Sequence, residues 1–215
     1  MFIGHFAVGL ASKKLAPRTS LVWLLMAPLL LDLLWPFFLI AGIERVSLIP
    51  DPPTPFLVLG LDHYPWSHSL VMALVWSVGF GLLVGAVARD RRGAVVAGVG
   101  VFSHWVLDYV THRPDMQLYP GGEAHVGLGL WYSTAGTIGV ELAMYAAAAA
   151  IYLSATRGKK LAIVSLLVFL LVMYVAATFG PPPPNVDALK YAALASWIVV
   201  PWAWWIERSR SGGSR

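Results

Sequence analysis

The chain has 215 residues, of which 58% are hydrophobic and only 12% are charged. Soluble domains carry about 25% charged residues, so this composition excludes an ordinary water-soluble protein and favours an exterior that contacts lipid. The chain contains no cysteine, which excludes a disulfide framework, a thiolate metal site and a cysteine nucleophile. Its 15 basic and 11 acidic residues give a net charge of +4.

The first apolar stretch, residues 2–15, is too short to cross a bilayer, and we expect it to lie at the interface or to re-enter the membrane. Its His5 and the Lys13-Lys14 pair argue against a cleaved signal peptide. Six longer apolar runs follow, each close to the roughly 20 residues that a spanning helix requires. These runs cover residues 21–43, 68–88, 94–112, 130–155, 161–179 and 188–206. We therefore predict a single all-α membrane domain over residues 1–215.

The positions of the charges predict how these helices are oriented. If the N-terminus is cytoplasmic, 12 of the 15 basic residues fall in cytoplasmic segments, and only Arg45, Arg113 and Lys190 remain outside. The positive-inside rule therefore predicts six crossings with both termini in the cytoplasm. The basic composition then reflects topology, so we expect the bilayer as a partner and no nucleic acid.

Three acidic residues, Asp32, Asp108 and Glu141, lie inside the apolar runs. An ionised group at the bilayer centre costs at least about 2.5–3.5 kcal/mol, so each requires a partner or a wet cavity. His104, Asp108 and His112 are spaced i, i+4 and i+8, which places them on one face of a helix. This spacing can direct two or three ligands at one cation.

Other polar residues reach the same depth. With a rise of about 1.5 Å per residue, Asp32 lies roughly 16 Å and His104 about 15 Å from the cytoplasmic ends of their helices. If the first stretch re-enters, His5 reaches about 12 Å. We therefore expect a polar chamber of His5, Asp32, His104 and Asp108 that opens outward past His112, His68 and His63.

Structural alternatives stay open for each residue. His104 and Asp108 can form a hydrogen-bonded pair between helices, and His63 and His112 can be interfacial polar residues. Glu141 can act as a general base or bond a Ser or Thr on a neighbouring helix. No basic residue shares the depth of Asp32, which leaves a metal or a histidine as its partner.

Several motifs resemble a known family. They are Gly4-His5, the Leu31-Asp32 element, His63-Tyr-Pro-Trp-Ser-His68 and the segment from Ser103 to His112. Over residues 1–120 the chain resembles the membrane-bound metal-dependent hydrolases, also described as LexA-binding, inner membrane-associated or YdjM-like. The resemblance implies a protein of the bacterial inner membrane with a metal site built from His5, Asp32, His63 or His68, His104 and Asp108. Leu31 departs from the usual Pro-Asp dipeptide, and residues 133–215 carry no matching motif.

We therefore predict a metal-dependent hydrolase that acts on a lipid-borne or membrane-delivered ester, with a phosphoester favoured and the active site facing the outer side. His and Asp donors without thiolate suit Zn, and Mn or Fe less well. His112 is a further candidate for a metal ligand, and Glu141 or Asp115 is the candidate general base. Arg113 is the candidate residue for contacting an anionic head group. The alternatives are a proton- or metal-coupled transporter or channel and a non-enzymatic scaffold.

Overall fold

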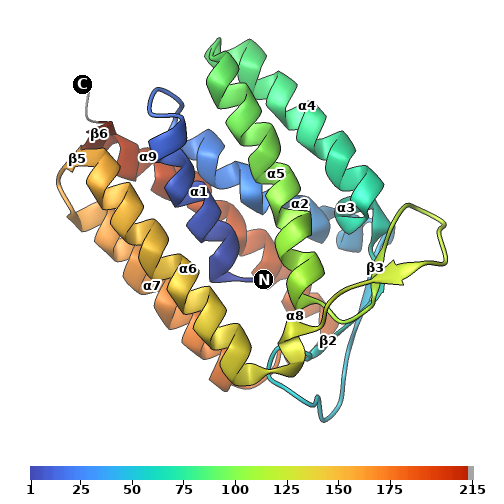
Figure 1. The fold of residues 1–215 in the computed structure, drawn as a ribbon. Coiled ribbons are helices and arrows are strands. Elements are labelled where there is room, and N and C mark those ends of the chain that lie inside the picture. Colours follow the sequence, from blue (N-terminus) through green and yellow to red (C-terminus); the bar gives the residue numbers. More distant parts are fainter. Residues whose placement is uncertain (213–215) are drawn as a thin grey trace.

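The computed structural model describes residues 1–212, which form a bundle of helices (Figure 1). Side-chain caps begin several of them, because Ser20, Ser69, Asp90 and Ser133 each accept a hydrogen bond from a backbone N–H of the first turn. In chain order the α-helices are α1 (Ile3–Leu15), α2 (Leu21–Ile40), α3 (Pro65–His68), α4 (Leu70–Ala88), α5 (Arg91–Thr111), α6 (Thr134–Ala155), α7 (Leu161–Phe179), α8 (Val186–Leu194) and α9 (Val199–Ser209).

Short antiparallel strand pairs and 3₁₀ turns connect the helices. β1 (Arg45–Leu48) pairs with β2 (Leu59–His63), and β3 (Met116–Gln117) pairs with β4 (His125–Val126). The 3₁₀ turns are η1 (Leu130–Tyr132) and η2 (Ala195–Ile198). No larger sheet forms among the described residues, so helix packing positions the interior side chains.

Five helices, α2, α4, α5, α6 and α7, are long and apolar enough to cross a membrane. Large apolar side chains on their outer faces are exposed, including Val78 and Leu82 on α4 and Val168 and Val172 on α7. Exposed side chains of this kind are expected where lipid, rather than water, surrounds a helix. The predicted all-α membrane architecture is confirmed.

The sixth predicted run differs from one continuous helix. It consists of α8 and α9 joined by η2, and neither helix alone is long enough to qualify as a span. Pro201 has no N–H to donate to the carbonyl of Trp197, which explains why the segment tightens just before it. The segment still returns the chain to the end where α6 and α7 join, because β6 (Arg210–Gly212) pairs with β5 (Thr156–Gly158).

Helix α1 lies inside the bundle and packs against α2, α5 and α6 (Figure 1). Gly9 makes the approach to α2 possible, because a Cβ at this position would lie 2.9 Å from the Leu24 carbonyl oxygen. Ile3 and Leu10 are fully buried. The first apolar stretch therefore enters the bundle and carries His5 into its interior.

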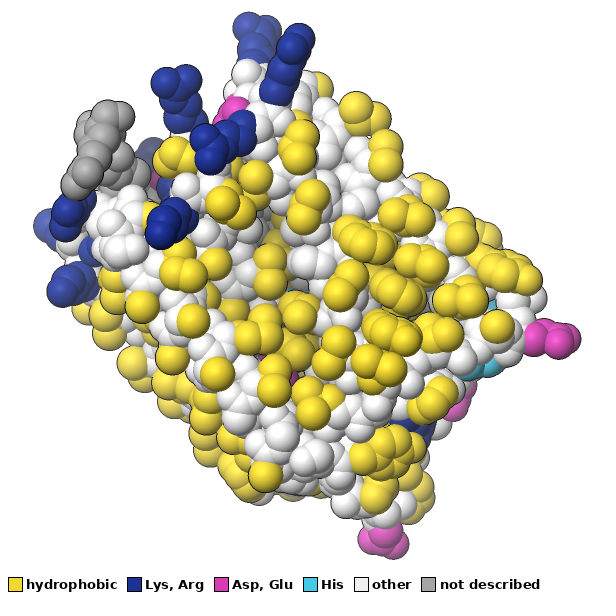
Figure 2. All heavy atoms as spheres, in the orientation of Figure 1, with side chains coloured by type: hydrophobic (Ala, Val, Ile, Leu, Met, Phe, Trp, Pro, Cys, Tyr) yellow, Lys and Arg dark blue, Asp and Glu magenta, His cyan; other side chains and the backbone are white. Residues whose placement is uncertain are grey.

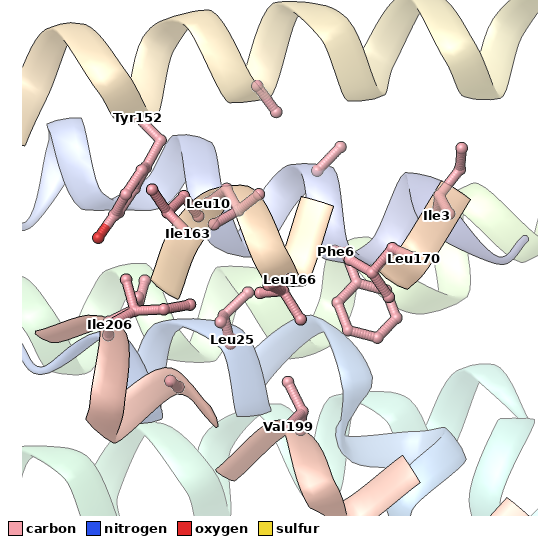
Figure 3. Close-up of a cluster of buried hydrophobic side chains, with 14 of the residues drawn as sticks. Ile3, Phe6, Leu10, Leu25, Tyr152, Ile163, Leu166, Leu170, Val199 and Ile206 are labelled. Atoms are coloured by element: carbon pink, nitrogen blue, oxygen red, sulfur yellow. The ribbon is translucent and has the colours of Figure 1, made fainter. Parts of the chain in front are cut away.

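Two apolar clusters flank α2. One joins α1, α2, α6, α7 and α9 and includes Leu10, Leu25 and Leu166 (Figure 3). The other joins α2 to α4 and α5 and includes Leu31 and Val101. Since α2 contributes to both clusters, it fixes the two halves of the bundle relative to each other.

Charged side chains separate toward opposite ends of the molecule (Figure 2). Most of the visible Lys and Arg gather at the end that carries the α4–α5 and α6–α7 connections, and most of the visible acidic side chains lie toward the opposite end. The broad surface between these ends is predominantly apolar, as expected for a membrane protein.

Candidate metal centre

Six side chains from four helices and one helix end converge between the two halves of the bundle. They come from α1, α2, α3, α5 and the residue that ends α5: His5, Asp32, His68, His104, Asp108 and His112. All except Asp32 are buried, and Asp32 is partly exposed. The structure thus brings together His5, Asp32, His104 and Asp108, the predicted chamber, with His68 and His112, which the sequence placed toward its outer opening.

Asp108 lies at the centre of this group, and its two oxygens face different partners. Oδ1 lies 3.1 Å from His5 Nε2 and 2.6 Å from the amino group of Met1. Oδ2 lies 3.0 Å from His104 Nε2, 3.8 Å from His112 Nε2 and 4.0 Å from His68 Nε2. Three imidazole nitrogens therefore converge on one carboxylate oxygen.

The backbone of α2 determines which nitrogen of His104 carries its proton. His104 Nδ1 lies 2.7 Å from the carbonyl oxygen of Pro28, which can only accept, so Nδ1 must donate. Gly100, one turn earlier on α5, permits this approach because a Cβ there would lie 3.0 Å from Ala27 Cβ. The other nitrogen, Nε2, is buried and has no hydrogen-bond partner among the described residues.

His68 and His112 are held in the same way. His112 Nδ1 lies 3.2 Å from Asp115 Oδ1, and His68 Nδ1 lies 2.6 Å from Ser67 Oγ. The ring of His5 stacks on that of His104, with centroids 3.8 Å apart and planes 2° apart. Each Nδ1 of His68, His104 and His112 thus has a partner outside the cluster, while each Nε2 faces inward.

Positive charge between Asp108 Oδ2 and the inward-facing nitrogens would stabilise this arrangement. A neutral histidine whose Nδ1 donates has a lone pair on Nε2, and a lone pair and a carboxylate oxygen repel each other. Three buried imidazolium ions would be costly to maintain. A divalent cation between His68, His104 and Asp108, whose donor atoms lie within 4.8 Å of one another, would supply that charge, and His112 contacts the same Asp108 oxygen from further away.

The donor set fits a metal ion. Zn–N bonds are about 2.0–2.1 Å and Zn–O bonds about 2.0–2.2 Å, so neighbouring ligands in a tetrahedron lie about 3.3–3.6 Å apart. The separations around Asp108 and Asp32 range from 3.0 to 4.0 Å. Two groups have donor atoms within 4.8 Å of one another: His5, Asp32 and His104, and His68, His104 and Asp108.

Glu141 on α6 is buried beside this cluster and holds the start of α1. Its Oε2 accepts hydrogen bonds from the backbone N–H groups of Phe2 and Gly4, at 2.9 and 3.1 Å. Its Oε1 accepts no hydrogen bond among residues 1–212. One oxygen of Glu141 is therefore structural, and the other is available to a ligand.

A cavity of about 160 Å³ adjoins the cluster. Asp32, His68, Asp108, His112 and Glu141 contribute polar groups to its lining. The rest of the lining is mostly apolar and consists of Met1, Phe2, Trp35, Phe56, Leu59, Leu61, Tyr64 and Trp131. No Lys or Arg side chain lines the cavity in the described part of the chain, so a bound molecule meets hydrophobic walls, His, Asp and Glu side chains, and Met1, whose amino group pairs with Asp108.

Three other candidate residues lie around the cluster. Arg113 Nε donates to Asp115 Oδ2 at 2.9 Å, and its Nη2 lies 3.4 Å from the carbonyl of Leu59. Asp115 also accepts from Tyr64 at 3.0 Å, so both of its oxygens are engaged. His63 is half-buried on β2 and belongs neither to the cluster nor to the cavity lining.

The contacts of Asp115 affect its pKa and that of Tyr64. Burial raises the pKa of Asp115, but hydrogen bonds from His112, Tyr64 and Arg113 outweigh it, so the pKa lies below its usual value. Burial, followed by the negative charge of Asp115, raises the pKa of Tyr64 well above its usual value. Tyr64 therefore donates to an ionised Asp115.

Sequence reasoning missed two residues next to His68. The buried carboxylate of Glu44 accepts hydrogen bonds from Ser67 N and Ser67 Oγ, both at 2.7 Å. In the sequence, Glu44 is one of several acids in outer segments, and Ser67 is a candidate helix cap. Only the adjacency of Ser67 to His68 could have drawn attention to this pair.

A family model described as YdjM inner membrane protein matches residues 1–180. The match extends past the motif-bearing first 120 residues and includes the helix that carries Glu141. No curated protein and no solved structure shows a significant match to the chain.

Proposed function

We propose that this chain, which belongs to the YdjM inner membrane protein family, is a metal-dependent hydrolase that cleaves a lipid-borne or membrane-delivered ester. The observation that carries the proposal is the convergence of His68, His104 and His112 on Asp108 in a buried site. His68, His104 and Asp108 would hold the ion, with His5 and Asp32 as adjacent donors around His104 and His112 as a further candidate through its contact with Asp108. Zinc is favoured because every donor is nitrogen or oxygen, and Mn or Fe are the alternatives.

A divalent ion bound there would act as a Lewis acid and make a water molecule more acidic. The free Oε1 of Glu141 would accept a proton from that water, since Glu141 lines the same cavity. Asp115 is less suited to this role, because both of its oxygens are bonded and it does not line the cavity. Its contacts favour orienting His112.

The cavity lining favours a substrate with an apolar group next to the scissile bond. Phe2, Phe56 and Trp131 offer hydrophobic surface within reach of Asp108 and Glu141. A phosphoester is favoured because a divalent ion would neutralise its charge. Arg113 is a weaker candidate for binding the head group than the sequence indicated, because its guanidinium is already engaged.

We propose that the site opens toward the outer side of the inner membrane. Phe56, Leu59, Leu61 and Trp131 belong to segments that the charge distribution places outside. A lipid substrate could then reach the cavity from the outer leaflet.

Metal analysis of the detergent-purified protein tests the centre. We expect bound zinc in the wild type and its loss in His104→Ala and Asp108→Ala. His125→Ala is the matched control, because His125 is exposed on β4 and outside the cluster. A wild type without metal, or an unchanged metal content in both cluster variants, would contradict the proposal.

Hydrolysis assays in micelles separate an enzyme from a transporter. Phospholipids and polyprenyl phosphates are suitable substrates, and micelles sustain no gradient. We expect turnover that is lost in Asp32→Ala and His104→Ala and retained in His125→Ala. Metal binding without turnover of any ester would instead favour a metal carrier.

A further inference from the structure

Glu44 is a buried carboxylate that the proposed reaction does not use. It follows the end of α2, and its backbone N–H donates to the carbonyl of Phe38 at 3.1 Å, which anchors it to that helix. Its residue is only 1% exposed, and no basic side chain pairs with it among residues 1–212. A buried charge without a cation is costly, which indicates that its hydrogen bonds have a specific use.

Those bonds lead directly to His68. Glu44 Oε1 accepts from Ser67 N–H, and Glu44 Oε2 lies 2.7 Å from Ser67 Oγ. The hydroxyl also lies 3.4 Å from the carbonyl of Tyr64. Both oxygen neighbours can only accept, so the proton of Ser67 Oγ points away from His68.

The orientation of this hydroxyl determines the tautomer of His68. Ser67 Oγ lies 2.6 Å from His68 Nδ1 and must accept there, because its own proton is used elsewhere. His68 therefore carries a proton on Nδ1. Its other nitrogen, Nε2, lies 3.4 Å from Asp32 Oδ1 and 4.0 Å from Asp108 Oδ2.

We propose that Glu44 is a positioning residue for the metal centre, which acts through Ser67 to hold the His68 lone pair on Nε2, directed at Asp32 and Asp108. The inference rests on the proposed function, because it assigns His68 as a ligand. Partners that orient a metal-binding histidine in this way set both its tautomer and its basicity.

Glu44→Gln tests the inference because it reverses the hydrogen-bond direction while preserving shape. The amide oxygen can still accept from Ser67 N–H, but the amide nitrogen then donates to Ser67 Oγ. The Ser67 proton is released toward His68 Nδ1, which moves the imidazole proton to Nε2. Ser67→Ala removes the connection altogether. Ser69→Ala is the matched control, because Ser69 Oγ caps α4 by accepting from Met72 N–H and makes no hydrogen bond to the His68 ring.

The first measurement is the tautomer itself, obtained from nitrogen NMR of metal-free protein labelled with ¹⁵N at histidine. We expect a protonated Nδ1 on His68 in the wild type and in Ser69→Ala, because Ser67 Oγ accepts there whether or not Nε2 also carries a proton. We expect an unprotonated Nδ1, with the proton on Nε2, in Glu44→Gln. The wild-type tautomer in Glu44→Gln would overturn the inference.

The second measurement is zinc affinity by competition with a chelator. Loss of an orienting partner typically costs 10- to 100-fold in affinity, and we expect this in Glu44→Gln and Ser67→Ala. In a His68→Ala background, Glu44→Gln should cause no further loss, because its effect passes through His68. An equal loss in both backgrounds would show a merely structural role and overturn the inference.

The two measurements separate this inference from the proposed function. A wild type that binds no zinc would reject the metal centre. The tautomer experiment uses metal-free protein and would still decide whether Glu44 sets the state of His68.

Discussion

At the scale of single residues, the acidic side chains near the cavity differ in how many of their oxygens are occupied. Asp115 bonds through both oxygens, and Glu141 bonds through Oε2 alone. An oxygen that already accepts strong hydrogen bonds is a poorer proton acceptor, because those bonds stabilise the ionised form. Glu141 is therefore the better candidate base.

Glu141→Gln should abolish most hydrolysis and retain the metal. The amide oxygen can still accept from Phe2 and Gly4 N–H, so α1 stays in place, but the side chain can no longer take up a proton. We expect kcat to fall by about 10²- to 10⁴-fold, which is typical for loss of a general base. Asp115→Asn should instead lower metal affinity, by about 10- to 100-fold. Full turnover in Glu141→Gln would exclude it as the base.

The sequence predicted some of these residues for a physical reason. Asp32 and Asp108 are conspicuous because charge in an apolar run is costly, and helix rise alone places His104 at a similar depth. Sequence reasoning did not select Glu44, because a charged residue in a loop is normally solvated and requires no special explanation. Only the folded chain shows that this loop turns inward beneath Ser67.

At the scale of elements, the position of α1 depends on close contact with its neighbours. At Gly9, an added Cβ would lie 2.9 Å from the Leu24 carbonyl oxygen and 3.0 Å from Leu25 Cα. Both are backbone atoms, which cannot move aside without displacing α2. The distance between α1 and α2 therefore determines whether His5 reaches Asp108.

Gly9→Val should push α1 away from α2. We expect a loss of about 1–3 kcal/mol in stability, as is typical for overpacking, together with reduced metal content because His5 moves. The control is Gly79→Val on α4, where an added Cβ meets no atom within 4 Å. Thermal unfolding in detergent and metal analysis would check both effects, and equal behaviour of the two variants would contradict this account.

The last crossing shows where element prediction from hydropathy fails. Apolar content across residues 188–206 predicts one span, but content carries no information about helix continuity. Pro201 interrupts the hydrogen-bond ladder, and the structure divides the segment into α8, η2 and α9. The predicted orientation of the C-terminal segment does not depend on helix continuity. The pairing of β5 with β6 still brings this segment back to the end where α6 and α7 join.

At the scale of the whole molecule, the separation of charge provides an orientation that can be tested directly. Figure 2 shows most Lys and Arg at one end and most acidic side chains toward the other. The positive-inside rule assigns the basic end to the cytoplasm. Since the sequence has no cysteine, a single introduced thiol is an unambiguous label for either end.

A membrane-impermeant maleimide should label Glu123→Cys in intact spheroplasts. Lys159→Cys should be labelled only after the membrane is permeabilised. Glu123 lies in the connection between α5 and α6, and Lys159 lies between β5 and α7, and both residues are exposed. The opposite labelling pattern would invert the molecule and place the cavity toward the cytoplasm.

The enclosed position of α1 also has a consequence for the order of assembly. During translation α1 is made before α2, α5 and α6, against which it packs. Glu141 follows Gly4 by 137 residues. The contacts of α1 with α6 can therefore form only after α6 has been made, when Glu141 can accept the hydrogen bonds from the Phe2 and Gly4 N–H groups. We therefore expect the proposed site to close late in biogenesis, after an ion has had access to the cluster. The proposed metal centre and the last stage of folding would then be coupled through one short helix.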